Sequence, residues 1–246
     1  ITGFCDVRSD TYTLMGRQQP KITLSDPGAT LGRPKGDQFP IALPGGRRTW
    51  CRIQRIRNVG ALIDARVRFI VHKQQFHRKN DPLDGSLLCY DNDLNAIHYC
   101  PERSDQGEGR ERIGMGVLLA QWLRWRDNPK TRQAVLSYHR FVRTHLQTRD
   151  GRTFGTAGRR DQMRLYDAPW AAQLHLELAR ATGEKRFYED CFRTLRAYYN
   201  HGGQRFYAIN IPMLDAVNAF ESAGLTARAK TLRQWFLNHA DVVIAN

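Results

Sequence analysis

Four carboxyl groups cluster in the sequence around the start of an apolar stretch. Asp105 and Glu108 precede the stretch, Glu111 begins its helical pattern, and Asp91 lies in a polar segment further upstream. Glycoside hydrolysis needs two carboxyl groups, about 5–5.5 Å apart in retaining enzymes and about 6.5–9.5 Å apart in inverting ones. A pair drawn from these four could supply general acid and base catalysis, with Asp105 and Glu108 ahead of Glu111 and Asp91. The structural alternatives are a first-turn acid that complements the helix dipole, for Glu111, and solvated loop residues for the others.

The same stretch carries arginines that could recognise a carboxylate on a substrate. Arg110 and Arg112 flank Glu111, and a guanidinium binds a carboxylate through two parallel hydrogen bonds. They would therefore suit a uronic acid, or they would simply neutralise the neighbouring acids. Aromatic rings such as Trp170 could stack on sugars, although its helical spacing also fits a core position. The candidate substrate-binding residues are Arg110, Arg112, Tyr90, Tyr166, Asp167, Trp170 and His201.

The composition is that of a globular protein with a strong basic excess. Hydrophobic residues make up 41% of the 246 residues, and 38 Lys and Arg face 24 Asp and Glu, a formal charge of +14. An anionic polysaccharide or nucleic acid would explain this charge, and so would an arginine-rich solvated surface. No apolar run approaches the roughly 18 residues that a membrane helix needs, so we expect no membrane association. The first residue is neither an initiator methionine nor the start of a signal peptide, which suggests a processed terminus or part of a longer chain.

Proline and glycine separate the chain into two regions of different character. Residues 1–52 are rich in both and predict an irregular segment, with short strands at 12–15 and 21–24. From residue 53 onward the apolar spacing is helical, beginning with a predicted helix over 53–76. A short hairpin that turns at Asn92-Asp93 is expected to follow this helix.

The remaining sequence predicts three helical hairpins. Helical spacing covers residues 110–126 with 130–147, 167–181 with 184–199, and 211–222 with 226–240. Connections within each pair are short and those between pairs are long, so the long connections should all lie on one rim of a stacked or toroidal array. The polar residues expected on that rim are Asp91, Asp105, Glu108, Arg110, Asp161, Tyr166, Asp167, Trp170 and His201.

Three segments resemble a known superfamily. Ser-Leu-Leu-Cys-Tyr-Asp at 86–91 and Gly-Arg-Glu-Arg-Ile-Gly-Met-Gly-Val-Leu-Leu-Ala at 109–120 look like the bacterial six-hairpin glycosidase-like proteins. Ala-Thr-Gly-Glu-Lys-Arg-Phe-Tyr at 181–188 is similar to a junction found throughout helical-toroid carbohydrate enzymes. The resemblance covers roughly residues 55–240 and implies a mainly α, (α/α) toroid-like domain over 53–246, with a carboxylate-lined cleft on one rim. A complete toroid needs more helices than this chain offers, so missing segments or a second chain would have to complete it.

These observations lead to one main functional hypothesis and two alternatives. The main hypothesis is a glycoside hydrolase, periplasmic or secreted, with a cytoplasmic location left open, that acts on an acidic polysaccharide or oligosaccharide without a cofactor. The first alternative is a polysaccharide lyase, in which arginines neutralise the uronate carboxylate and Tyr90, Tyr166, His98 or His201 abstracts the C5 proton. The second is a non-catalytic module that binds glycan or nucleic acid, although the evenly spread charge and the lack of a nucleic-acid motif argue against nucleic acid. The eight histidines show no HExxH-type spacing, so we predict no metal site.

Overall fold

The computed structural model describes residues 30–31, 38–42, 46, 48–52, 58–99, 110–158, 160–161, 163–206 and 210–245. The chain divides into two units, Ile1–Val59 and Gly60–Asn246. We describe each unit by itself. The strands predicted at 12–15 and 21–24 lie outside the described residues.

The first unit contains a three-stranded antiparallel sheet. Its strands are β1 (Thr30–Leu31), β2 (Gln38–Ala42) and β3 (Arg48–Arg52), in the order β1-β2-β3. The register pairs Phe39 with Cys51 and Ile41 with Thr49.

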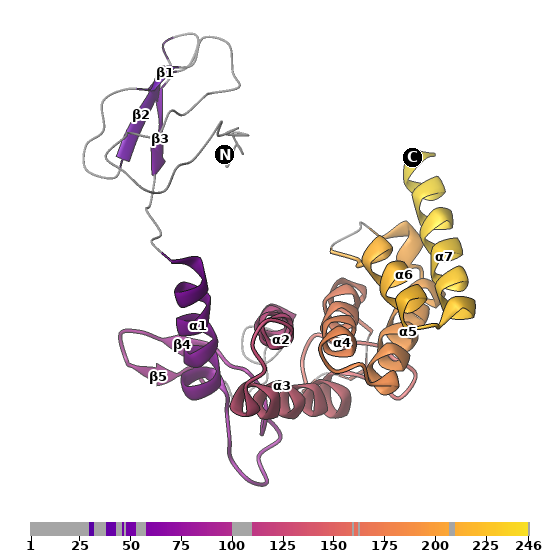
Figure 1. Ribbon diagram of the computed structural model, residues 1–246, viewed down its shortest axis with the longest axis horizontal. Helices are drawn as coiled ribbons and strands as arrows, with labels where there is room; N and C mark the ends of the chain where they lie inside the picture. The colour runs from indigo at the N-terminus through magenta and orange to yellow at the C-terminus, as the bar shows by residue number, and fades with distance from the viewer. Residues whose placement is uncertain are drawn as a thin grey trace. The chain divides into compact units, whose positions relative to one another are not determined.

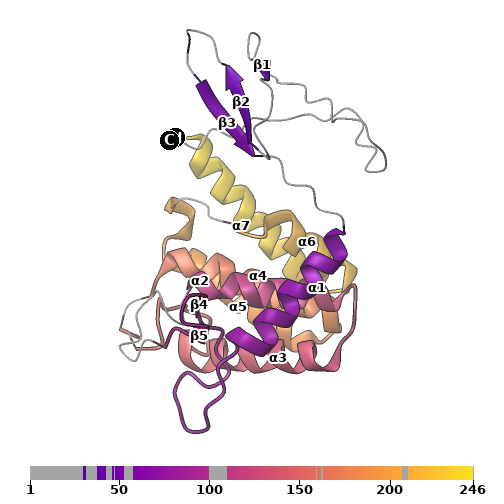
Figure 2. The ribbon, with the colours of Figure 1, turned by 90° about the vertical axis from the view of Figure 1, so that its left-hand side faces the viewer.

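The second unit is mainly helical, as the apolar spacing predicts. Its α-helices are α1 (Val59–Phe69), α2 (Arg110–Leu123), α3 (Pro129–Phe141), α4 (Ala168–Thr182), α5 (Lys185–Asn200), α6 (Met213–Ser222) and α7 (Thr226–Ile244). The pairs α2–α3, α4–α5 and α6–α7 are the three predicted hairpins, and they follow one another in chain order across Figure 1. In Figure 2, which is turned by 90° from Figure 1, α1 lies in front of α3, α4 and α5. The described helices thus form an (α/α) toroid-like array.

Residues with strong preferences for helix ends mark several of the helix boundaries. The side chain of Asn128 caps α3 by accepting a hydrogen bond from the backbone N–H of Thr131 at 3.1 Å, and Pro129 follows at the first helical position. Gly183, after α4, and Gly224, after α6, have φ of 72° and 74°, a left-handed conformation that glycine adopts at little cost. These residues make the connections within the hairpins short and well defined.

Two predicted helices end earlier than expected, in a π-helical turn. The helix predicted over 53–76 is α1 followed by the π-helical η2 (Ile70–Gln74), and the one predicted to end at Gln147 is α3 followed by the π-helical η3 (Val142–Leu146). Gln75 then pairs with Leu87 and Gln147 with Thr153 as isolated β-bridges. A single π turn shifts the apolar register, so these endings could not be read from a regular helical period.

The predicted hairpin is present between α1 and α2. Its strands β4 (Tyr90–Asp91) and β5 (Ala96–Ile97) pair antiparallel, with Tyr90 opposite Ile97. The turn between them covers residues 92–95, including Asn95 in a left-handed conformation with φ of 50°. The hairpin therefore holds Tyr90 and Asp91 at its closed end.

Helix α4 is the centre of the core. Ten of its residues are buried, among them the charged Glu177 and the polar His175. It packs against α2 on one side and α5 on the other. Helices α3 and α5 are more amphipathic and cover this centre, which is the expected arrangement for inner and outer helices of a hairpin array. No described helix is long and apolar enough to cross a membrane.

Gly116 marks the closest approach between α2 and its neighbours. A Cβ atom at Gly116 would lie 2.5 Å from ring carbons of Tyr138 on α3 and 3.2 Å from Leu174 on α4. At Gly114 the nearest atom, on the ring of Trp170, would be at an ordinary 3.7 Å. Gly116, and not Gly114, is thus the position in α2 where close helix packing requires a glycine.

We predict that Gly116→Ala destabilises the protein by about 1–3 kcal/mol, because the fully buried ring of Tyr138 leaves no room for a methyl group. Gly114→Ala is the matched control and should be neutral or stabilising by up to about 1 kcal/mol, through helix propensity alone. Urea unfolding of both variants measures the difference. Equal stability of the two variants would contradict this account of the packing.

Candidate functional site

Helices α2 and α4, which both follow long connections, begin side by side, and we call this region the rim. The start of α2 lies against the start of α4, since Gly114 faces the ring of Trp170. The loop after η3 joins the same region through a hydrogen bond from the N–H of Arg164 to the carbonyl of Thr153, at 2.8 Å. The connection before α6 reaches it through Asn210, whose amide donates to Gln173 of α4 at 2.6 Å.

Arg164, Tyr166 and Asp167 lie side by side just before α4. Tyr166 and Asp167 belong to the 3-10 turn η4 (Leu165–Asp167). The guanidinium carbon of Arg164 lies 5.6 Å from the ring centre of Tyr166, and its Nε lies 3.9 Å from Oδ1 of Asp167. Asp167 is fully buried. Its carboxylate is thus better suited to hold Arg164 in place than to contact a substrate.

Arg112 and Trp170 bring hydrogen-bond donors to this rim. Arg112 is half-buried in the first turn of α2, and Trp170 is half-buried at the start of α4 with its ring against the apolar core. Nε of Arg112 and Nε1 of Trp170 are both buried, and neither has an acceptor within the part of the chain that the structure describes. Buried donors without an acceptor are costly, so each of the two is expected to have a partner that the described residues do not supply.

The hairpin residues have local structural roles. Oδ1 of Asp91 accepts hydrogen bonds from the N–H groups of Asp93 and Leu94, both at 2.9 Å, which closes the turn. The hydroxyl of Tyr90 donates to Asn95 at 2.5 Å. Both side chains are therefore engaged within the hairpin.

Of the other predicted site residues, some are exposed and some lie outside the residues that the structure describes. His98, Asp161 and His201 are exposed, and Nδ1 of His201 lies 2.8 Å from the carbonyl oxygen of Ala197. Asp105 and Glu108 lie outside the described residues. Arg110 and Glu111 occupy the first turn of α2, but their side chains are also outside the description. The carboxylate pair consequently stays a prediction.

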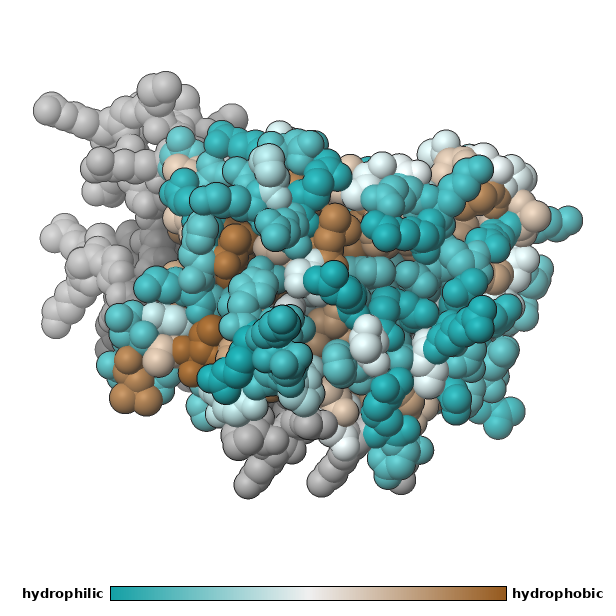
Figure 3. All heavy atoms as spheres, turned by 90° about the horizontal axis from the view of Figure 1, so that it is seen from below, coloured by the Kyte–Doolittle hydropathy of each residue, from teal (hydrophilic) through white to brown (hydrophobic). Residues whose placement is uncertain are grey.

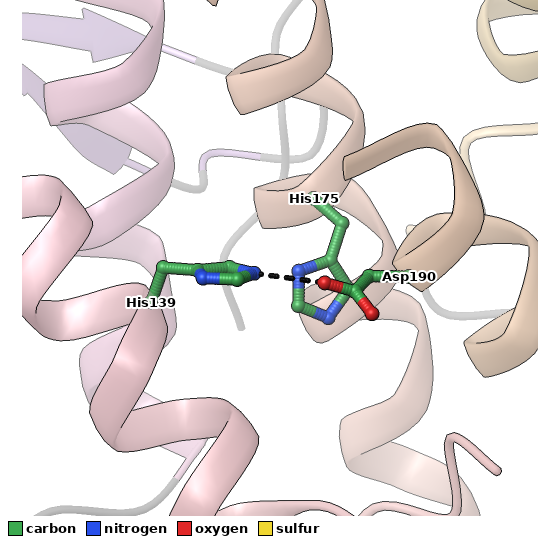
Figure 4. A group of neighbouring side chains, drawn as sticks. All are labelled: His139, His175 and Asp190. Carbon is green, nitrogen blue, oxygen red and sulfur yellow. Dashed lines mark hydrogen bonds and ion pairs between the residues drawn. The ribbon is translucent and has the colours of Figure 1, made fainter. Parts of the chain in front are cut away.

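A second polar cluster, between α3, α4 and α5, was not predicted from the sequence. His139, His175 and Asp190 each come from a different helix and point toward a common centre (Figure 4). Nε2 of His139 lies 3.2 Å from Oδ2 of Asp190, and Nε of Arg143 lies 3.2 Å from Oδ1 of the same carboxylate. Because an ionised carboxylate only accepts hydrogen bonds, Nε2 of His139 is the donor.

Gln147 connects this cluster to the surrounding loops. Its Oε1 accepts from Nε2 of His175 at 2.9 Å and from Arg143 at 3.0 Å. Its Nε2 donates to the hydroxyls of Thr153 and Thr194, both at 3.0 Å. Both polar atoms of the Gln147 side chain are thus hydrogen-bonded, and the bond to His175 fixes the orientation of that ring.

Burial controls the protonation of the cluster. Desolvation lowers the pKa of His175 well below its usual value, and the neighbouring His139 adds to the shift, so His175 is neutral at pH 7. Desolvation alone would raise the pKa of Asp190. The hydrogen bond from His139 and the charge of Arg143 outweigh that effect, so the pKa lies below its usual value and the carboxyl group is ionised.

An open groove of about 1310 Å³ runs along the outer side of α3 and reaches His139. The surface on this side is largely hydrophilic (Figure 3). Its strongly basic lining residues are Lys130, Arg132, Arg140, Arg143 and Arg186. Three of them are already paired with carboxylates, since Arg132 contacts Asp127, Arg186 contacts Glu184 and Arg143 contacts Asp190. The groove is therefore less able to attract an anion than its arginine content suggests.

The spacing of the cluster residues explains why the sequence did not reveal it. His139, His175 and Asp190 are separated by long stretches of chain, and no short motif joins them. One signal was present, because His175 lies between Leu174 and Leu176 in a helix that is mostly buried. A polar residue at such a position must find a partner in the core.

Comparison with solved structures identifies a similar protein. The polysaccharide lyase BACCELL_00875 is 33% identical to this chain, with a TM-score of 0.75 over 85% of the chain. The match covers 32% of the lyase, so the chain spans about a third of that protein's length. The sequence matches no protein-family model and no curated protein. The mainly α, toroid-like fold thus occurs in a polysaccharide-degrading enzyme, while membership of the six-hairpin glycosidase superfamily is not confirmed.

We predict that Gln147→Leu lowers the free energy of unfolding by roughly 2–4 kcal/mol, because it leaves His175, Thr194 and Thr153 without their buried partner. The matched control is Gln133→Leu, an exposed position on the preceding helix, which should change stability by no more than about 0.5 kcal/mol. Chemical denaturation followed by circular dichroism measures both. A Gln147→Leu protein as stable as the control would show that the network contributes nothing.

Proposed function

We propose that this chain belongs to a polysaccharide lyase that cleaves a uronate-containing polysaccharide by β-elimination. The observation that carries the proposal is the likeness to a polysaccharide lyase at 33% identity over 85% of the chain. The likeness favours the lyase alternative over the glycoside hydrolase that was our main expectation. Because the chain spans only about a third of that lyase, the activity and substrate of the whole protein stay part of the proposal.

The reaction places two demands on the site. A base removes the proton from C5 of the uronate, the C5–H electron pair forms the C4=C5 double bond, and the C4–O bond breaks. The leaving glycosidic oxygen then takes up a proton, and no water is consumed. A cationic donor at the uronate carboxylate stabilises the negative charge that develops as C5 loses its proton.

The described rim residues fit these demands. Arg112 is proposed to bind the uronate carboxylate, since it is a half-buried guanidinium whose Nε has no acceptor among the described residues. Tyr166 is proposed as the base, because it lies at the same rim with Arg164 at its ring. Trp170, in the first turn of α4 and half-buried, is proposed to contact a sugar with the exposed part of its ring.

The remaining candidate bases are less well placed. The hydroxyl of Tyr90 is engaged with Asn95 in the hairpin turn. Nδ1 of His201 is engaged with the carbonyl of Ala197, and His98 is exposed on the hairpin. These contacts favour Tyr166 over the three alternatives.

The test of the reaction is ultraviolet absorbance. The protein, incubated with a panel of polysaccharides that contain glucuronate, galacturonate or mannuronate, should produce a rise in absorbance from the unsaturated uronate on at least one polymer. New reducing ends without this absorbance would instead support hydrolysis. Neither signal on any polymer in the panel would contradict the proposal that the chain has carbohydrate-cleaving activity.

Tyr166→Phe tests the assignment of the base. It removes only the hydroxyl and should reduce kcat by about 100- to 10,000-fold, the range typical of a lost general base. Tyr99→Phe is the matched control, since Tyr99 is exposed and its hydroxyl donates to Asp81 at 3.2 Å. A Tyr166→Phe enzyme with the activity of the control would assign the base elsewhere.

A further inference from the structure

The buried cluster of His139, His175 and Asp190 has the donor set of a metal site. Each residue offers one ligand atom, and these atoms all lie within 4.8 Å of one another. Two imidazole nitrogens and a carboxylate oxygen form a donor set that divalent zinc and related transition metals bind. The three residues come from three helices, so the fold itself brings them together (Figure 4).

The hydrogen bonds around His175 leave a lone pair on its Nδ1 that could bind a metal ion. Oε1 of Gln147 accepts from Nε2 of His175, so Nε2 carries the proton of the neutral ring. Nδ1 is therefore unprotonated. It is buried within a fully buried residue, and it has no hydrogen-bond partner in the region that the structure describes. A metal-binding histidine is commonly oriented in this way, with its other nitrogen bonded to a side-chain or backbone oxygen.

We propose that Nε2 of His139, Nδ1 of His175 and Oδ2 of Asp190 bind a divalent transition-metal ion, for which Zn²⁺ is the best match. The proposal is independent of the lyase reaction, because the cluster lies within the helical hairpins and not among the rim residues. It also differs from the sequence-based expectation of no metal site, which considered only the spacing of histidines along the chain.

One pair of the ligand atoms already has the spacing that a bound ion requires. Ligand atoms of a tetrahedral ion with bonds of about 2.0–2.2 Å lie about 3.4 Å apart. Nε2 of His139 and Oδ2 of Asp190 already lie 3.2 Å apart, and all three ligand atoms lie within 4.8 Å of one another. The side chains of His139 and Asp190 are 12% and 13% exposed, and His139 lines the groove beside α3. The groove gives the ion an entry path and could supply water as the fourth ligand.

Two neighbouring side chains orient the proposed ligands. Gln147 fixes the His175 ring, and Arg143 holds Oδ1 of Asp190, which directs Oδ2 toward the two histidines. Binding requires the lone pair of Nε2 of His139, so the proton that this nitrogen donates to Asp190 must leave it, either for Nδ1 of the same ring or for solvent. The positive charge of Arg143 beside the ion should make the site weaker than a closed site with two or more anionic ligands.

The test uses chelator-treated protein titrated with Co²⁺ and then with Zn²⁺. We expect one Co²⁺ per chain, with the visible ligand-field absorption of a tetrahedral complex that Zn²⁺ displaces. Because the ion joins α3, α4 and α5, free Zn²⁺ at about 100 times its Kd should raise Tm by roughly 5–10 °C. Excess chelator should reverse that increase.

Two ligand variants and one control locate the ion. His139→Gln and Asp190→Asn should each lose the cobalt absorption, with affinity reduced by more than the roughly 10- to 100-fold typical of an outer-shell change. His77→Gln is the control, since His77 is an exposed histidine of the same groove and should bind as the wild type does. If Asp190→Asn fails to fold, His139→Gln decides alone, because its side chain is close to the groove.

Three results would overturn the proposal. The first is wild-type protein that shows neither cobalt absorption nor a zinc-dependent rise in Tm. The second is His139→Gln protein that folds and binds Co²⁺ as tightly as the wild type. The third is loss of binding in His77→Gln, which would place the ion on the groove surface. Lyase activity plays no part in these readouts, so failure of either proposal is distinguishable from failure of the other.

Discussion

The burial of α4 is the constraint on which the rest of the helical unit depends. A helix that is covered on nearly all sides must satisfy every polar group it carries inside the protein. Glu177 does so through Arg124 at 3.2 Å and Arg180 at 3.1 Å, and these contacts connect α4 to the end of α2. His175 does so through Gln147, which connects α4 to the end of η3. The polar residues of α4 therefore decide which neighbouring elements must be positioned accurately.

The same burial explains why two chemically different regions arise in one small unit. Near the middle of the hairpins, α4 contributes a polar side chain to a closed network in which most donors and acceptors are paired. At its first turn α4 contributes Trp170 beside Arg112, and both carry donors that the described protein groups leave unpaired. The first region favours a rigid framework, and the second lies where the long connections enter the helices. A rigid helical framework beneath a polar rim suits an enzyme that must orient a polymer chain.

The sequence predicted the fold more completely than the site, for physical reasons. The helical hairpins follow from apolar spacing and from local signals such as Asn128, Pro129 and Gly183, which act over only a few residues. The π-helical turns after α1 and α3 could not be predicted, because tertiary contacts of Gln75 and Gln147 determine where these helices end. The rim was expected from the alternation of connection lengths, and the approach of Gly114 on α2 to Trp170 on α4 brings two of the expected helix starts together. The buried cluster was missed since its members meet only after three helices have packed. The leading carboxylates, Asp105 and Glu108, lie outside the described residues, so the prediction of their role rests on the sequence alone.

The ion pairs of Glu177 lie near the ends of α2 and α4 that lead into the short connections. They tie neighbouring hairpins together at a distance from the rim, where the long connections lie. Insertions or substitutions in the long connections can therefore accumulate without loosening the helices beneath them. This separation gives the architecture evolvability, because changes that alter ligand preference and changes that alter stability fall on different residues. Relatives of this chain should accordingly differ in loop length and composition at the rim while they retain the helical hairpins.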